Sequence, residues 1–184
     1  MLVIATLASR RLLRLCLLLS VATVLSGGWP LTAAAQTAAL QTGVQVISAN
    51  LAQPVLLGPA QMARLPRQQV TRPDHDGKNR TYSGVSLCAV LMAAGAKIGP
   101  DLPRKGMAHY VLVSAADGYQ AVFALAELNP DFAPRPVLLA DRCDGQPLPA
   151  TAGPYQIIVP DEKKMGRCVR QVQSLRVVAA QPQS

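Results

Sequence analysis

The sequence predicts one α+β domain, in which a compact, mixed β-sheet core carries two or three short helices. Short apolar segments of strand length outnumber the segments with helical periodicity. Aspartate–glycine pairs at 76–77 and 117–118 stand between such segments, as they do in β-hairpins. A length of 184 residues allows one domain and a leader, and we place the domain at residues 36–178.

The individual elements follow in order from alternation, apolar periodicity and turn chemistry. Alternation predicts a strand over 44–48, and prolines near both ends predict a helical turn within 58–66. A polar hairpin loop is expected over 72–79, and apolar spacing predicts a helix over 86–94 that ends at Gly95.

The second hairpin pairs 110–114 with 119–123, and Asn129-Pro130 ends a helical turn over 124–128. The last strands are expected over 137–140, 155–159 and 169–178, before a disordered tail at 179–184.

Residues 1–35 have the pattern of a secretory signal peptide, with early arginines, a leucine-rich run over 12–25 and small residues before Gln36. That run is shorter than the ~20 residues of a membrane span, so no stable membrane insertion is expected after cleavage. Ser9-Arg-Arg half-fits a twin-arginine signal, which leaves general secretion and twin-arginine export both open. We therefore expect a periplasmic or secreted protein.

Charge and aromatic content argue against nucleic-acid binding. Removal of the three arginines of the leader lowers the formal net charge from +8 to +5. No basic surface interleaved with aromatic residues is expected from so few aromatic side chains. The basic excess gathers near the carboxyl terminus, which indicates either an anion site or a solvated strand edge: Lys163, Lys164, Arg167, Arg170 and Arg176.

Three segments carry the most informative motifs. They are Tyr82-Ser-Gly-Val-Ser-Leu-Cys-Ala-Val-Leu91, Leu138-Leu-Ala-Asp-Arg-Cys-Asp-Gly-Gln-Pro-Leu148, and Gly153-Pro-Tyr-Gln-Ile-Ile-Val-Pro160 with Met165-Gly-Arg-Cys-Val-Arg-Gln-Val172. They resemble segments of sulfite-oxidase-type molybdenum enzymes. The segment at 82–91 resembles W-x-G-V-x-L-x-x-V-L, and the segment at 138–148 resembles L-L-A-x-x-x-N-G-x-P-L. The segments at 153–160 and 165–172 resemble G-x-P-L-R-x-V-x-P-G and G-A-R-S-V-K-W-L.

This resemblance implies the sulfite-oxidase type of molybdopterin-binding fold. It also implies a molybdopterin cofactor, whose pterin and phosphate the family holds at the R-S-V-K positions. In this chain those positions are Arg167, Cys168, Val169 and Arg170. Guanidinium groups and backbone N–H groups are suitable partners for a phosphomonoester.

One feature of the family is missing. The cysteine that ligates molybdenum there lies upstream of the segment matched at Tyr82, and residues 35–82 contain no cysteine. A thiolate is a soft ligand that other side chains do not replace equivalently, which argues against bound molybdenum. The resemblance then implies a non-catalytic or vestigial relative that binds an anionic small molecule or a periplasmic protein partner. The alternative is a molybdopterin-dependent oxidoreductase with atypical ligation by Cys168, His75 or solvent.

The histidines and cysteines offer the remaining candidate groups. His75 lies between two aspartates and is expected either to bind the cofactor or a metal, or to form part of a solvated turn. His109 is either a ligand or a structural histidine. Cys88 has helical spacing to apolar neighbours, which predicts burial. Cys143 and Cys168 lie in segments that converge in the family fold, and we expect a disulfide between them, worth roughly 2–4 kcal/mol.

Overall fold

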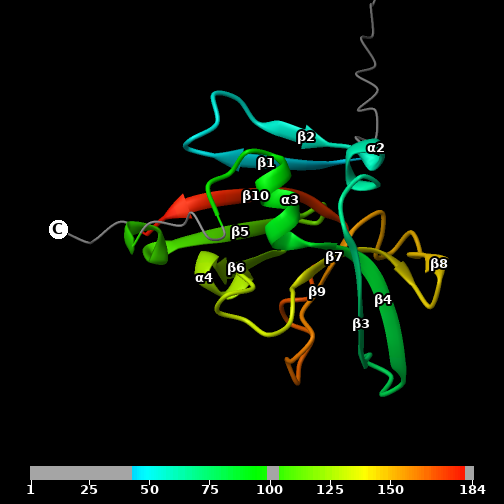
Figure 1. Ribbon diagram of the computed structural model, residues 1–184. Coiled ribbons are helices and arrows are strands. Elements are labelled where there is room, and N and C mark those ends of the chain that lie inside the picture. The colour runs from blue at the N-terminus through cyan, green and yellow to red at the C-terminus, as the bar shows by residue number, and fades with distance from the viewer. Residues whose placement is uncertain (1–42, 99–103, 181–184) are drawn as a thin grey trace, which may run out of the picture. The chain divides into compact units, whose positions relative to one another are not determined.

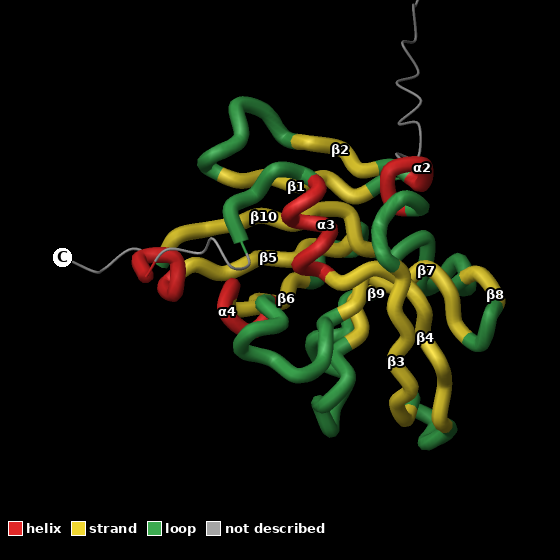
Figure 2. The backbone as a smooth tube through the Cα atoms, viewed as in Figure 1, coloured by secondary structure: helices red, strands yellow, loops and turns green. Residues whose placement is uncertain are grey.

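The computed structural model describes residues 43–98 and 104–180. The expected signal peptide and most of the expected tail lie outside these residues. The described chain forms two five-stranded sheets, sheet A and sheet B (Figures 1 and 2). This architecture of mixed sheets with a few short helices confirms the predicted fold class.

Sheet A has the strand order β2-β1-β10-β5-β6. Strands β1 and β10 are parallel, and the other neighbouring pairs are antiparallel. Strand β10, the last strand of the described chain, therefore pairs with β1, the first strand. The strands span β1 (Val44–Ser48), β2 (Val55–Leu57), β5 (His109–Ala115), β6 (Gln120–Ala124) and β10 (Val172–Ala179).

Sheet B has the order β3-β4-β7-β8, and β9 pairs with β7 as a branch. All of its pairs are antiparallel. The long β3–β4 hairpin extends away from sheet A (Figure 1). The strands span β3 (Arg67–Pro73), β4 (Asn79–Ser86), β7 (Leu138–Cys143), β8 (Gln146–Pro147) and β9 (Gln156–Ile158).

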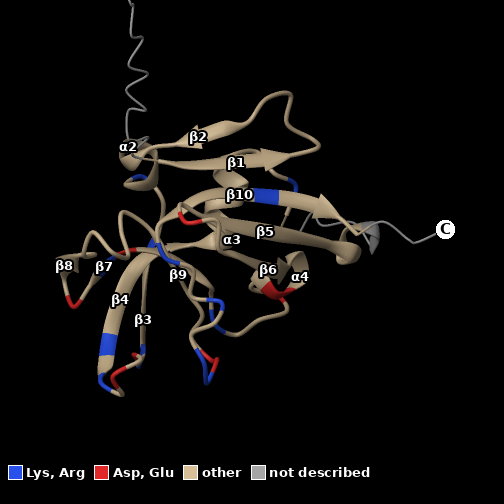
Figure 3. Ribbon diagram, turned by 180° about the vertical axis from the view of Figure 1, so that it is seen from behind, with Lys and Arg blue, Asp and Glu red and all other residues tan. Residues whose placement is uncertain are grey.

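The helices are short and lie between strands: α2 (Pro59–Met62), α3 (Leu87–Ala93), α4 (Leu125–Leu128) and a 3₁₀ helix, η2 (Arg104–Ala108). Helix α3 lies across one face of sheet A (Figures 1 and 3). The hydroxyl of Ser86 accepts a hydrogen bond from the Ala89 N–H at 3.2 Å and caps this helix. No helix in the described ranges is long and apolar enough to span a membrane.

Turn chemistry correctly predicted both hairpins. Gly77 and Gly118 have φ values of 77° and 85°, which a residue with a Cβ rarely adopts. The predicted strand at 44–48 and the helix that ends before Gly95 are also confirmed.

Three local predictions were wrong or missing. Strands β2 and β8 were not predicted, because three and two residues are too short for a visible alternation. The last strand begins at Val172 and not at 169, because Gln171 has φ +48° and breaks the extended conformation. Its other end reaches Ala179, one residue into the range expected for the tail.

A continuous apolar core lies between sheet A, helix α3 and the inner side of sheet B. A second, smaller cluster packs on the other side of sheet B and consists of Val70, Tyr82, Leu138, Ala140 and Ile158. Tyr82 belongs both to this cluster and to the pocket described below. Charged residues gather on the β3–β4 turn and on the loops near β9, whereas the open face of sheet A carries few (Figure 3).

Gly84 allows strands β4 and β7 to approach closely. A Cβ at this position would overlap the Leu139 carbonyl oxygen and lie 2.5 Å from the Ala140 Cα atom. Both are backbone atoms of β7 and cannot rotate away.

We predict that Gly84→Ala lowers the free energy of unfolding by at least about 2 kcal/mol, because the added methyl group forces β4 and β7 apart. Gly166→Ala is the matched control, since its Cβ would meet no atom within 4 Å; it should change stability by less than about 0.5 kcal/mol. Urea denaturation of both variants measures the effect. Equal stability of the two variants would show that the strands can separate without cost.

Candidate functional site

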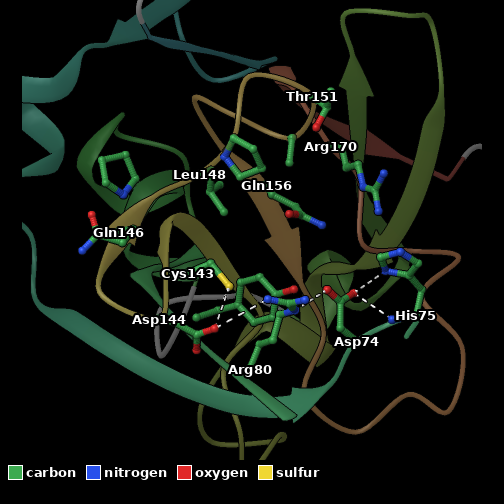
Figure 4. Close-up of a pocket in the computed structure, with 14 residues that line it drawn as sticks. Asp74, His75, Arg80, Cys143, Asp144, Gln146, Leu148, Thr151, Gln156 and Arg170 are labelled. Atoms are coloured by element: carbon green, nitrogen blue, oxygen red, sulfur yellow. Dashed lines mark hydrogen bonds and ion pairs between the residues drawn. The ribbon is translucent and has the colours of Figure 1, made fainter. Parts of the chain in front are cut away.

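A pocket of about 510 Å³ opens on the side of sheet B that faces away from the main core (Figure 4). Its walls come from the β3–β4 turn, β4, the end of β7, the segment around β8, β9, and the residues just before β10. These elements are distant in sequence, and the β4–β7–β9 pairing brings them together. The pocket is therefore a product of the tertiary fold and not of one motif.

One guanidinium faces the acidic side chains on the floor of this pocket. Arg80 forms ion pairs with Asp74 at 2.9 Å and Asp76 at 3.0 Å, and lies 3.8 Å from Asp144. Asp144 also accepts a hydrogen bond from the Thr81 N–H at 2.8 Å. The aspartates therefore already have partners within the protein.

Asp74 and His75 form a second contact at the rim. The Asp74 carboxylate accepts hydrogen bonds from the His75 backbone N–H at 2.8 Å and lies 3.0 Å from the His75 ring Nδ1. Burial alone would raise the pKa of Asp74, but the hydrogen bonds from His75 and the charge of Arg80 outweigh it, and the pKa is lowered. Asp74 is therefore an ionised, internally satisfied carboxylate at neutral pH.

Two other polar groups of the pocket have no such partners. Gln156 on β9 is only 3% exposed, yet its side-chain amide forms no hydrogen bond with any described residue (Figure 4). The exposed guanidinium of Arg170 forms no ion pair within the described chain. Both side chains extend toward the same space (Figure 4).

Backbone hydrogen bonds fix the segment that carries Arg170. The Gln171 N–H donates to the Ala152 carbonyl at 2.8 Å, and the Val172 N–H donates to the Tyr155 carbonyl at 2.9 Å. The positive φ of Gln171 turns the chain at this point. Arg170 is thereby held above the pocket before the chain enters β10.

The structure sets Arg167 apart from the other residues at the R-S-V-K positions, since Cys168, Val169 and Arg170 all border one cavity. Of the four, only Arg170 also lines the larger pocket. Arg167 pairs with Glu127 at 2.9 Å and with Glu162, and its guanidinium lies 4.6 Å from the centre of the Phe123 ring. Cys168 and Val169 are buried, and each also borders a smaller cavity of about 340 Å³ on the other side of Arg170. His75, the fifth candidate, does line the pocket, with a 70% exposed side chain.

The cysteines of the described chain are all free thiols. The expected bond between Cys143 and Cys168 is not formed, because Cys143 lines the pocket whereas Cys168 is buried and accepts a hydrogen bond from Arg72 at 3.3 Å. Burial and the nearby Asp144 carboxylate raise the pKa of Cys143, so this thiol is protonated at neutral pH. Cys88 is buried, as its helical spacing predicted.

His109 starts β5 and does not line the pocket. Its Nδ1 atom is buried without a hydrogen-bond partner in the described chain. Within residues 43–98 and 104–180, no group of three or more His, Cys, Asp or Glu side chains is placed to hold a metal ion.

The two-sheet fold with a pocket at the β4–β7–β9 junction places the chain in a known class. Residues 50–184 match the family described as oxidoreductase molybdopterin binding domain, and the chain belongs to this family. No curated protein matches the chain.

The fold is also found in solved structures, of which 29 chains match. One is the sulfane dehydrogenase SoxCD from Paracoccus pantotrophus, with a TM-score of 0.55 and 17% sequence identity. The match covers 74% of this chain and 38% of that chain, so this protein spans less than half of the length of that relative. The predicted sulfite-oxidase-type fold is therefore confirmed.

The residues present do not fit the cofactor that the family name implies. Cys143 is the single thiol that lines the pocket, and it lies on β7 and not in the segment upstream of Tyr82, where the ligand of the family lies. The Arg167 guanidinium is bound by two glutamates, which leaves Arg170 as the one basic group of the R-S-V-K positions free to contact a phosphate. Two carboxylates, Asp74 and Asp144, also line the same space.

Sequence reasoning missed Gln156, Arg80 and Asp144 as pocket residues. A signal existed for Asp144, because it stands at the asparagine of the L-L-A-x-x-x-N-G-x-P-L motif. Gln156 had no such signal, since only the folded chain places its amide in the pocket. Arg80 had no comparable signal, since its three aspartates come together only in the folded chain.

The lowered pKa of Asp74 generates a pH prediction. A carboxyl group whose pKa is lower in the folded state stabilises the fold above its unfolded pKa, which is near 3.8, and this contribution is lost as the pH falls through the folded pKa. We expect the free energy of unfolding of the wild type to fall from about pH 4 downward, and that of Asp74→Asn to fall less steeply. Denaturation curves at several pH values test this. The exposed Asp161→Asn is the control, and an identical slope for all three proteins would contradict the prediction.

Proposed function

We propose that this protein is a non-catalytic member of its family, exported from the cytoplasm, that binds an anionic small molecule in the pocket beside Arg170. The observation that carries this proposal is the difference between the two arginines of the R-S-V-K positions. Arg167 is neutralised by glutamates, whereas Arg170 presents an uncompensated guanidinium to the pocket. A guanidinium in that state is a suitable partner for a carboxylate or phosphate oxygen.

The electrostatics of the rest of the pocket support an anion at this position. Asp74 and Asp144 repel an anion, and Arg80 and the Thr81 N–H reduce this repulsion because they bind the oxygens of both carboxylates. The pocket volume of about 510 Å³ lies within the range of small-molecule sites. Leu148, Pro147 and Pro149 provide an apolar wall opposite the polar floor.

The non-catalytic part of the proposal rests on the donor atoms. Residues 43–87 contain no cysteine, so the segment upstream of α3 offers no thiolate. Cys143 reaches the pocket from β7, with a pKa that burial raises. The proposal of export rests on the pattern of residues 1–35.

We predict that Arg170→Met weakens the binding of small anions about tenfold or more, since a charge-assisted contact contributes about 1.5–3 kcal/mol. Calorimetric titration with phosphate and with benzoate measures this loss. Arg176→Met is the matched control. Arg176 lies on β10 and does not line the pocket, so the substitution removes the same charge away from the site. Equal affinities in the wild type and Arg170→Met would contradict anion binding at this site.

A second prediction concerns the metal. Protein purified from the periplasm of a molybdenum-replete host should begin at Gln36 and contain less than about 0.1 molybdenum atom per chain, because residues 36–87 contain no cysteine to serve as the thiolate ligand. Amino-terminal sequencing and elemental analysis of the same sample test both statements. Near-stoichiometric molybdenum would establish an oxidoreductase with atypical ligation instead.

A further inference from the structure

The amide of Gln156 provides information about the ligand beyond its charge. This side chain is 97% buried, lines the pocket, and has no hydrogen-bond partner in the described chain. No atom of this amide is both fully buried and without a partner, so the amide is accessible from the pocket and available to a ligand there. Its oxygen accepts and its NH₂ group donates, so an adjacent C=O and N–H pair on a ligand would satisfy both at once.

The charge of the pocket limits the charge of the ligand. The charged residues that line it are two arginines and two aspartates: Arg80, Arg170, Asp74 and Asp144. These charges sum to zero, and Arg80 pairs with the aspartates, so Arg170 is the one lining guanidinium without a carboxylate partner in the described chain. One guanidinium compensates one carboxylate, whereas a phosphomonoester dianion would leave an excess negative charge near two aspartates.

We propose that the ligand is a small organic monocarboxylate that carries a lactam or carboxamide edge, with Arg170 binding the carboxylate and Gln156 selecting the amide edge. This inference rests on the proposed anion-binding function of the same pocket. It assigns to Gln156 the role of a specificity-determining residue.

The test compares three probes on the intact mature protein by calorimetry or ligand-detected NMR. Orotate carries a carboxylate and lactam edges on a flat six-membered ring, benzoate carries the carboxylate alone, and inorganic phosphate is the multiply charged anion. We expect orotate to bind about tenfold more tightly than benzoate, because two neutral hydrogen bonds distinguish them. Phosphate should bind more weakly than orotate.

Two variants locate the effect. Gln156→Leu should lower the affinity for orotate about tenfold, to that for benzoate. Gln156→Arg should improve phosphate binding about tenfold, because it adds a second cation. Circular dichroism and the melting temperature establish that each variant is folded. The comparison of orotate with benzoate on the wild type tests the inference even if a variant does not fold.

The outcomes separate this inference from the proposed function. If Arg170→Met weakens both carboxylates but orotate and benzoate bind the wild type equally, the role of Gln156 is refuted and anion binding stands. Tighter binding of phosphate than of orotate by the wild type would also refute the monocarboxylate. If Arg170→Met changes no affinity, the anion site itself is refuted.

Discussion

The buried guanidinium of Arg72 is the interaction on which the site region depends. Arg72 is 3% exposed and donates hydrogen bonds to the carbonyl oxygens of Val159 and Glu162 and to the sulfur of Cys168. These acceptors belong to the chain between β9 and β10, whereas Arg72 belongs to β3. A buried cation requires such acceptors, because removing one would leave it uncompensated in a medium of low polarity. The loop that leads to Arg170 is therefore attached to the hairpin that carries Asp74 and His75.

A second arginine, Arg80, determines the electrostatics of the pocket. Arg80 holds the carboxylates of Asp74, Asp76 and Asp144 on the β3–β4 hairpin and the β7–β8 turn. Without this guanidinium, the charges of Asp74 and Asp144 in the pocket lining would outweigh the single charge of Arg170, and its attraction for an anion would be cancelled. The proposed anion binding would therefore depend on a residue whose own charge is already paired with carboxylates. The two arginines have different roles, and only Arg170 is left for a ligand.

The fold could be predicted from the sequence largely because its turns are local. The Asp76-Gly77 and Asp117-Gly118 pairs specify their hairpins through the positive φ of each glycine. The site was less predictable, because the partners of each side chain come from distant segments. Arg167 and Arg170 have similar positions in the motif, yet Glu127 lies 40 residues from Arg167 and binds it only after folding. The positive φ of Gln171, which ends the predicted strand early, was equally invisible, since glutamine rarely adopts that conformation.

The family fold and the lining of the pocket depend on different parts of the chain. The backbone determines the fold, and the side chains determine the lining of the pocket. Main-chain hydrogen bonds hold the pocket walls together, from Ile157 to Val169 and from Val172 to Tyr155. These bonds do not depend on which side chains project from the same strands, so the backbone can persist while the lining changes. Gln156 illustrates this separation: its backbone pairs with Ala140 in the sheet, while its amide faces the pocket without a partner. A fold inherited with its backbone intact can therefore present a new set of polar groups to a different ligand.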